Sequence, residues 1–252
     1  MTDRDMLFDY LLRLGDNSLI LGQRLAEWTG HTPMLEEDLA LTNVGLDLIG
    51  QARMLLAYSG EVEGKGRDED RLAFHRDTAE WRNLLLLEQP NGDFAKTMAR
   101  QFFFDQFQYL QFEALSTSSE ERLAGIAAKS LKEIAYHRRH STDWILRLGD
   151  GTAESHERMQ TAIDELWGFV PEMFEMDATD DALLVAGIGI DVARLRAAWD
   201  AAVNDVLVEA TLARPKDSWS VRGSREGKHS EHLGYILAEM QFLQRAYPDA
   251  KW

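Results

Sequence analysis

Apolar residues recur along most of this chain at steps of three and four residues, which is the spacing of one face of an α-helix. The pattern breaks at proline, at glycine and at short charged stretches. No convincing series of strands stands between these breaks. The helices that the pattern predicts cover about residues 6–28, 34–58, 71–87, 93–116, 119–148, 154–170, 192–213 and 230–247.

Several residues indicate where these helices begin and end. Asp93 and Asp191 are good N-caps, because an aspartate side chain accepts hydrogen bonds from the first free backbone N–H groups of a helix. Ser118 and Glu121 have the spacing of a capping box. Gly149 is suited to the position just after a helix.

The lengths of the connections predict the topology. Short loops join 6–28 to 34–58 and 93–116 to 119–148, so each pair should form antiparallel neighbours. A much longer connection separates the two pairs. One long crossover between two helical hairpins is the arrangement of a ferritin-like bundle. We therefore predict an all-α, ferritin-like antiparallel four-helix bundle with additional peripheral helices, forming a single domain over residues 1–252.

Composition and charge limit the function. The chain has 252 residues, of which 45% are hydrophobic, and a net charge of −16, which argues against binding nucleic acid or an anionic membrane. It contains no cysteine, which excludes thiolate chemistry. The longest uncharged apolar stretch, 182–190, is too short to span a bilayer. Together with an acidic start that lacks the apolar run of a signal peptide, these features predict a cytoplasmic protein.

Ferritin-like bundles often bind two irons through one glutamate from each of two helices and a Glu-x-x-His pair from each of the others. The helix predicted over 34–58 offers Asp47, but Gly50 stands at the histidine position. The helix over 119–148 offers His137, but Ile134 stands at the glutamate position.

The remaining helices add little to this set of donors. Asp105 lies among phenylalanines and is a plausible inward carboxylate, and Glu133 could bend toward the face of His137. The total is about half of a di-iron set, so we predict no bound metal and no catalytic residue in this chain.

A buried hydrogen-bonded network is the favoured interpretation of the same residues, because buried charges persist only when they are paired. In that network a protonated His137 lies between Asp47 and Asp105, helped by Arg53 or Lys132.

Five stretches of the chain carry a family resemblance that runs over about residues 11–252. They are LGDN (14–17), GLDLIGQAR (45–53), LEQPNG (87–92), KEIAYH (132–137) and EHLG (231–234). With them the chain resembles the PaaC-type subunits of bacterial phenylacetyl-CoA monooxygenase (1,2-epoxidase), in the PaaA/PaaC family of ferritin-like proteins.

The resemblance implies a structural, non-catalytic subunit in aerobic phenylacetate degradation. Its partner would be a related PaaA-type catalytic subunit that carries the di-iron site and acts on phenylacetyl-CoA with O₂. The complex would also contain small subunits and a reductase with FAD and an iron–sulfur centre that draws on NADPH. Gly50 and Ile134 would then stand where a metal-binding sibling has histidine and glutamate.

The residues leave other functions open. One is a di-iron oxygenase in its own right, using Asp47, Asp105, Glu133 and His137. Another is a ferroxidase or iron-storage protein. Metal analysis of the isolated chain distinguishes both from a structural subunit.

Arg222, Arg225, Lys228 and His229 gather potential cations within eight residues of an acidic chain. They form either a solvated loop or a contact for an anion. The anion would be an acidic patch on the catalytic partner or the phosphates of its CoA substrate, which arginine and lysine bind well.

Two further groups of residues, one of histidines and glutamates and one of tryptophans, are weaker candidates for a site. His229, Glu231 and His232, with Glu239, form either a metal site or, as we favour, the polar start of a helix. Candidate interface aromatics near predicted helix ends and loops are Trp28, Trp219 and Trp252.

Overall fold

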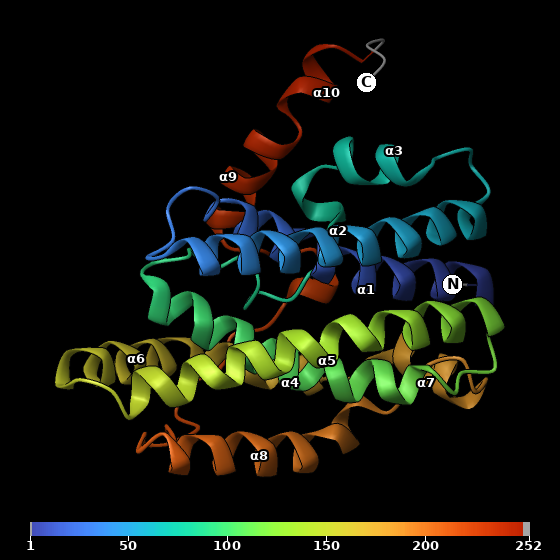
Figure 1. The fold of residues 1–252 in the computed structure, drawn as a ribbon. Helices are drawn as coiled ribbons and strands as arrows, with labels where there is room; N and C mark the ends of the chain where they lie inside the picture. The colour runs from blue at the N-terminus through green and yellow to red at the C-terminus, as the bar shows by residue number, and fades with distance from the viewer. Residues whose placement is uncertain (1, 249–252) are drawn as a thin grey trace. The chain divides into compact units, whose positions relative to one another are not determined.

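The computed structural model describes residues 2–248, and in that part of the chain every regular element is helical (Figure 1). None of the helices found there is long and apolar enough to cross a membrane. The α-helices are α1 (Asp3–Ala26), α2 (Leu35–Glu63), α3 (Glu69–Phe74), α4 (Phe94–Leu115), α5 (Glu121–Gly149), α6 (Ala153–Leu166), α7 (Ala178–Val185), α8 (Val192–Glu209), α9 (Glu231–Met240) and α10 (Phe242–Ala246). The 3₁₀ helices are η1 (Thr78–Glu80), η2 (Trp167–Phe174) and η3 (Ser224–Glu226).

The chain divides into two compact units. The first comprises the chain up to Pro90 together with the segment from Arg222 onward, and the second comprises the segment between them. Each unit contains one long helical hairpin. The ferritin-like bundle and the single domain concern the assembly of the two units, and both stay predictions.

The hairpin of the first unit pairs α1 with α2. A Cβ atom at Gly15 would lie 3.0 Å from Leu56, and one at Gly22 would lie 3.2 Å from Ile49. Positions that advance along α1 therefore meet positions that retreat along α2, so the two helices are antiparallel. The small residues bring the two backbones close together, which accounts for the glycine of the LGDN stretch.

The hairpin of the second unit pairs α4 with α5, also antiparallel. The Ser141 hydroxyl of α5 donates to Asp105 of α4 over 2.8 Å. The Arg138 guanidinium lies 3.9 Å from the centre of the Tyr109 ring. Both hairpins have the direction that their short connections predict.

Helix α4 is the centre of the second unit, as its apolar circumference predicts. Phe103 is fully buried, and its ring centre lies 5.6 Å from that of Trp167 and 5.9 Å from that of Trp199. The Trp199 indole N–H donates to the Phe103 carbonyl over 3.0 Å. The only polar group of that indole is therefore satisfied inside the core.

The crossover helix predicted over 71–87 is replaced by α3, η1 and a stretch without regular structure. Polar side chains of α1 hold this stretch. The backbone N–H of Arg82 donates to Asp16 over 2.9 Å, and that of Leu84 donates to Asn17 over 2.8 Å. These long-range bonds satisfy donors that a helix would otherwise satisfy internally.

Two of the three N-caps predicted from the sequence are present in the structure. Asp93 and Asp191 cap α4 and α8 as predicted. The capping box of Ser118 with Glu121 is wrong, because Glu120 is the N-cap of α5. The Ser118 hydroxyl instead donates to the Ile188 carbonyl over 2.7 Å.

The helix predicted over 230–247 divides into α9 and α10 at Gln241. The Gln241 amide is turned inward and donates to the carbonyls of Ala73 and Arg76 over 3.0 and 3.1 Å. Helix α7 was not predicted, and it occupies part of the apolar stretch 182–190.

Candidate functional site

On α2 the most deeply buried side chains with ligand spacing are one position later than Asp47 and Gly50. Gly50 is exposed, with nothing within 4 Å of a Cβ built there, and Asp47 is half-buried. Leu48 and Gln51 are both 0% exposed. Leu48 and Gln51, which have the same spacing, are therefore more deeply buried than Asp47 and Gly50. The assignment of Asp47 and Gly50 to the ligand positions of a bundle stays a prediction, because the bundle would be formed by both units.

On α5 the inward pair is the one that the sequence indicates. Ile134 is 0% exposed and His137 is 1% exposed, so they share the buried face. Glu133 is half-buried and Lys132 is exposed. The imidazole thus reaches the core without a glutamate at the preceding ligand position.

Asp105 is the carboxyl group at the centre of the second unit. It is fully buried, and its oxygens accept hydrogen bonds from the Gln101 amide over 2.7 Å and the Ser141 hydroxyl over 2.8 Å. Burial raises the pKa of Asp105 to about 7, although the nearby His137 and the two hydrogen bonds work in the opposite direction. The carboxyl group is consequently balanced between its neutral and charged forms near neutral pH.

This cluster does not fit a di-iron centre. Such a centre needs several carboxylates and imidazoles, whereas the cluster supplies Asp105 and His137. Both oxygens of Asp105 already accept hydrogen bonds from uncharged side chains. Among residues 2–248, no three or more His, Cys, Asp or Glu are grouped so that they could hold a metal ion.

The second unit contains two members of the predicted network around His137. Asp105 lies close enough to His137 to feel its charge. Arg53 belongs to the first unit, where its guanidinium pairs with Glu69 over 3.1 Å, and its part in the network stays a prediction. Asp47 belongs to the first unit and His137 to the second. The neutral donors Gln101 and Ser141, which the ligand pattern does not include, are the partners that the structure adds.

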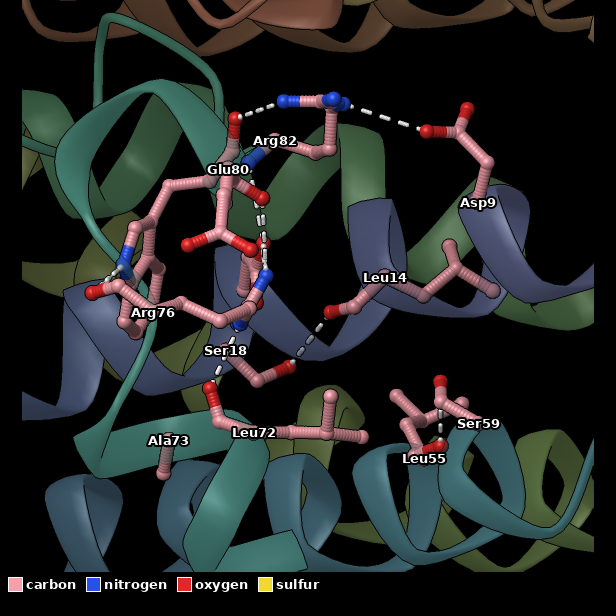
Figure 2. Close-up of polar contacts among 12 residues, drawn as sticks. Asp9, Leu14, Ser18, Leu55, Ser59, Leu72, Ala73, Arg76, Glu80 and Arg82 are labelled. Carbon is pink, nitrogen blue, oxygen red and sulfur yellow. Dashed lines mark hydrogen bonds and ion pairs between the residues drawn. The ribbon is translucent and has the colours of Figure 1, made fainter. Parts of the chain in front are cut away.

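The first unit contains a second buried polar cluster, centred on an ion pair. Asp16 is 0% exposed and Arg76 is 1% exposed, and the guanidinium binds both carboxylate oxygens, one of them over 2.9 Å. The same guanidinium lies 4.3 Å from the centre of the Trp81 ring. Its Nε donates to the Leu72 carbonyl over 2.6 Å (Figure 2). The ion pair therefore joins α1 to the irregular crossover.

Arg82 extends this cluster toward the surface. Its Nε donates to the Asp9 carboxylate over 3.1 Å, as Figure 2 shows, while its backbone N–H donates to Asp16. Asp9 also pairs with Arg13 over 2.6 Å. Two carboxylates of α1 thus bind the crossover at Arg76 and Arg82.

Glu88 binds the C-terminal segment to the crossover. Its carboxylate is fully buried and accepts from the Asn83 amide over 3.0 Å and from the backbone N–H of Ser230 over 2.6 Å. His229 Nδ1 lies 2.9 Å from the same carboxylate, and Nε2 lies 3.0 Å from the Trp81 carbonyl. Since both ring nitrogens face acceptors, the geometry favours the doubly protonated imidazolium.

The position of His229 corrects its assignment to the cation cluster. Its side chain is only 1% exposed. Burial lowers its pKa, but the hydrogen bond to Glu88, the charge of Glu88 and the contact with the Trp81 carbonyl outweigh burial, so the pKa is raised above its usual value. His229 is therefore an internal ion-pair partner of Glu88.

Replacing His229 by glutamine should destabilise the protein mainly at low pH. A histidine with a raised pKa contributes stability that is fully present below its unfolded pKa of about 6.5 and is lost as the pH rises through the folded value. We expect the melting temperatures of His229→Gln and the wild type to differ more at pH 6 than at pH 9. A difference that does not change with pH would contradict the charged pairing.

The remaining cation candidates lie in the first unit. Arg222 and Lys228 are exposed and Arg225 is half-buried. The Lys228 ammonium contacts Glu226. Contact of these residues with an anion stays a prediction.

The candidate interface tryptophans differ in their surroundings. Trp28 is half-buried. Trp219 is 47% exposed, and its ring meets Phe169 edge-on at 5.6 Å and covers Gly168, where a Cβ would lie 2.3 Å from the indole. Trp252 lies outside the described residues.

Three of the five stretches that carry the family resemblance contain residues of the buried polar clusters described above. LGDN contains Asp16 and Asn17, LEQPNG contains Glu88, and KEIAYH contains His137. Sequence reasoning missed Arg76, the partner of Asp16. The available signal was a carboxylate inside an apolar helix, which requires a buried partner.

These features describe an all-helical protein whose polar interior links its elements to one another. Comparison with known proteins gives the same family as the sequence motifs: the family model described as phenylacetic acid catabolic protein matches residues 1–252, and the chain belongs to this family. It is 52% identical over 248 residues to the subunit designated C in the 1,2-phenylacetyl-CoA epoxidase of Escherichia coli (strain K12). That similarity covers 98% of this chain and 100% of the relative.

Proposed function

We propose that the chain is a non-catalytic structural subunit of a multicomponent phenylacetyl-CoA oxygenase, a ring 1,2-epoxidase of aerobic phenylacetate degradation. It pairs with a related di-iron catalytic subunit and stabilises it. FAD, the iron–sulfur centre and NADPH belong to the reductase of the complex. Phenylacetyl-CoA binds to the catalytic partner and not directly to this chain. The complex works in the cytoplasm.

One observation carries the non-catalytic role. Of the inward positions with ligand spacing, Leu48 and Ile134 cannot bind a metal, and Gln51 is neutral. Only His137 is a usual iron ligand. Asp105 adds one carboxyl group whose oxygens already accept hydrogen bonds from neighbours.

Two further observations support assembly into a complex. The relative that matches over the whole chain is described as a subunit of an epoxidase. The two antiparallel hairpins and the long connection between them have the order of a ferritin-like bundle, which is the fold that we propose for the assembled chain. Di-iron carboxylate proteins are built on that fold, so a structural and a catalytic sibling could share it.

Metal analysis with an activity assay tests the proposal. The chain is purified alone and together with the catalytic and reductase subunits, and iron and NADPH-dependent conversion of phenylacetyl-CoA are measured in each sample. We expect the isolated chain to bind no stoichiometric iron and to show no turnover, while the complex has both. A two-iron centre in the isolated chain would favour the alternative of a di-iron oxygenase or ferroxidase.

A further inference from the structure

A groove on the second unit lies between α4, α5 and α8 and has a volume of about 460 Å³. Helix α5 supplies most of its wall, including Arg138, Arg139, Thr142 and Asp143, and Gln106 comes from α4. All three helices belong to the same unit. Sites that bind small molecules have volumes of roughly 300–1,000 Å³, so the groove is large enough for such a ligand.

The two arginines of the groove form no ion pair with a carboxylate of residues 2–248. Other arginines of the second unit do form such pairs. Arg196 and Arg214, for example, both pair with Asp200, over 3.0 and 2.8 Å. In a chain whose net charge is −16, two arginines without a carboxylate partner are unusual, and their local positive field attracts an anion.

Aromatic rings restrict both guanidinium groups of the groove. The group of Arg138 lies 3.9 Å from the centre of the Tyr109 ring, and that of Arg139 lies 5.7 Å from the centre of the Tyr136 ring. Within the described part of the chain neither guanidinium donates a hydrogen bond, so the N–H groups stay available. A carboxylate matches them well, because its two oxygens accept two parallel hydrogen bonds from one guanidinium.

Thr142 adds an uncharged donor to the groove. Its hydroxyl oxygen accepts a hydrogen bond from the Gln106 amide over 3.1 Å. The hydroxyl proton has no acceptor among residues 2–248, so it can be donated to a ligand. Thr142 lies one helical turn after Arg138, and the two side chains project from the same face of α5. The guanidinium and the hydroxyl can therefore bind the same anion.

The charge of the groove favours a monoanion. Arg138 and Arg139 contribute two positive charges and Asp143 contributes one negative charge, which leaves a net charge of +1. Asp143 repels a dianion more strongly than a monoanion. The α8 side of the groove is apolar, because it is formed by the half-buried Ala202 and Val206. A hydrocarbon group is stabilised against such a surface.

We propose that this groove binds a small organic monocarboxylate. Arg138, Arg139 and Thr142 hold the carboxylate, and the hydrocarbon group of the ligand lies against α8. The site is independent of the proposed function, because the second unit of this chain forms it alone. It is also separate from the buried cluster of Asp105, none of whose members lines the groove.

Four probe compounds separate the contributions of charge and hydrocarbon. Calorimetric titration of the full chain at pH 8 measures the dissociation constants of benzoate, benzamide, acetate and inorganic phosphate. Benzamide has the shape of benzoate without its charge, acetate lacks the ring, and phosphate is mainly a dianion. We expect benzoate to bind most tightly and each of the others to bind at least about ten-fold more weakly.

Arg138→Gln and Arg139→Gln test whether benzoate binds in the groove. Each removes a hydrogen bond between charged groups, so we expect the dissociation constant of benzoate to rise at least about ten-fold. Arg147→Gln is the matched control, because Arg147 is on the same helix and also contacts an aromatic ring, that of Trp144 at 5.5 Å, but does not line the groove. It should change the constant less than about two-fold. All three variants should keep the melting temperature of the wild type.

Asp143→Asn tests the selectivity for a monoanion. The substitution removes the only negative charge among the residues that line the groove, so we expect benzoate to bind about three-fold more tightly. Phosphate should gain more than benzoate, because the repulsion of a dianion is larger.

Several outcomes would overturn the proposal. Equal losses in Arg139→Gln and Arg147→Gln would mean that benzoate responds to the charge of the helix and not to the groove. Equal affinities for benzoate and benzamide would show that the carboxylate is not recognised. Tighter binding of phosphate than of benzoate would make the class of ligand wrong. Butyrate is titrated as a second hydrocarbon, and the absence of binding by both benzoate and butyrate would mean that the groove is not a carboxylate site.

Discussion

Replacing Arg76 by alanine is expected to lower the free energy of unfolding by about 3–5 kcal/mol. The substitution leaves the Asp16 carboxylate charged and buried, with its guanidinium partner removed. It also removes the contact with the Trp81 ring and the hydrogen bond to the Leu72 carbonyl. An unpaired buried charge costs far more than the loss of an exposed one.

Chemical denaturation followed by circular dichroism measures this loss. Arg53→Ala is the matched control, because it also removes an arginine–carboxylate pair of the first unit, but one whose arginine side chain is 76% exposed. Exposed pairs contribute about 0–1 kcal/mol. Equal losses in the two variants would mean that the Asp16–Arg76 pair does not stabilise the first unit.

Replacing Asp105 by asparagine should change how stability depends on pH. The pKa of this buried carboxyl is about 7 in the folded protein, against an ordinary value of 3.8. Between pH 3.8 and about pH 7 the wild type therefore takes up a proton on folding. Its free energy of unfolding falls as the pH rises through this range. Asparagine keeps a neutral group of similar shape, so the variant avoids this loss.

We expect the stability of Asp105→Asn relative to the wild type to increase by about 1–3 kcal/mol between pH 5 and pH 8. The substitution also alters the hydrogen bonds to Gln101 and Ser141, but this effect on stability is the same at both pH values. It therefore cancels when the relative stability at pH 5 is subtracted from that at pH 8. Asp143→Asn, at an exposed position of α5, is the control and should give no such increase. Parallel stability curves for Asp105→Asn and the wild type would show that Asp105 does not titrate in this range.

The helical hairpins could be predicted because their signals are local. A three-and-four periodicity and a cap such as Asp93 act within one or two turns of a helix. The crossover could not be predicted in this way. It is held by Asp16 and Asn17, more than sixty residues earlier in the chain, and these bonds leave no periodic pattern in its own sequence.

The rotation of α2 about its own axis could not be predicted for a related reason. This helix is apolar on two faces, since Leu48 is buried while Leu46 is exposed. Periodicity alone does not fix the rotation of such a helix about its axis, because exposed and core leucines look the same in a sequence. The sequence therefore did not show that Leu48 and Gln51 are more deeply buried than Asp47 and Gly50. On α5, where charged residues flank a single stripe, His137 was placed on the correct face.

The discontinuous first unit has a consequence for synthesis on the ribosome. Its carboxylate at Glu88 binds His229 and the backbone of Ser230, which emerge about 140 residues later. The second unit is a continuous segment and can fold while translation is still under way. The first unit can be completed only after the segment from Arg222 onward has been translated, so its partners for Glu88 are the last of its contacts to become available.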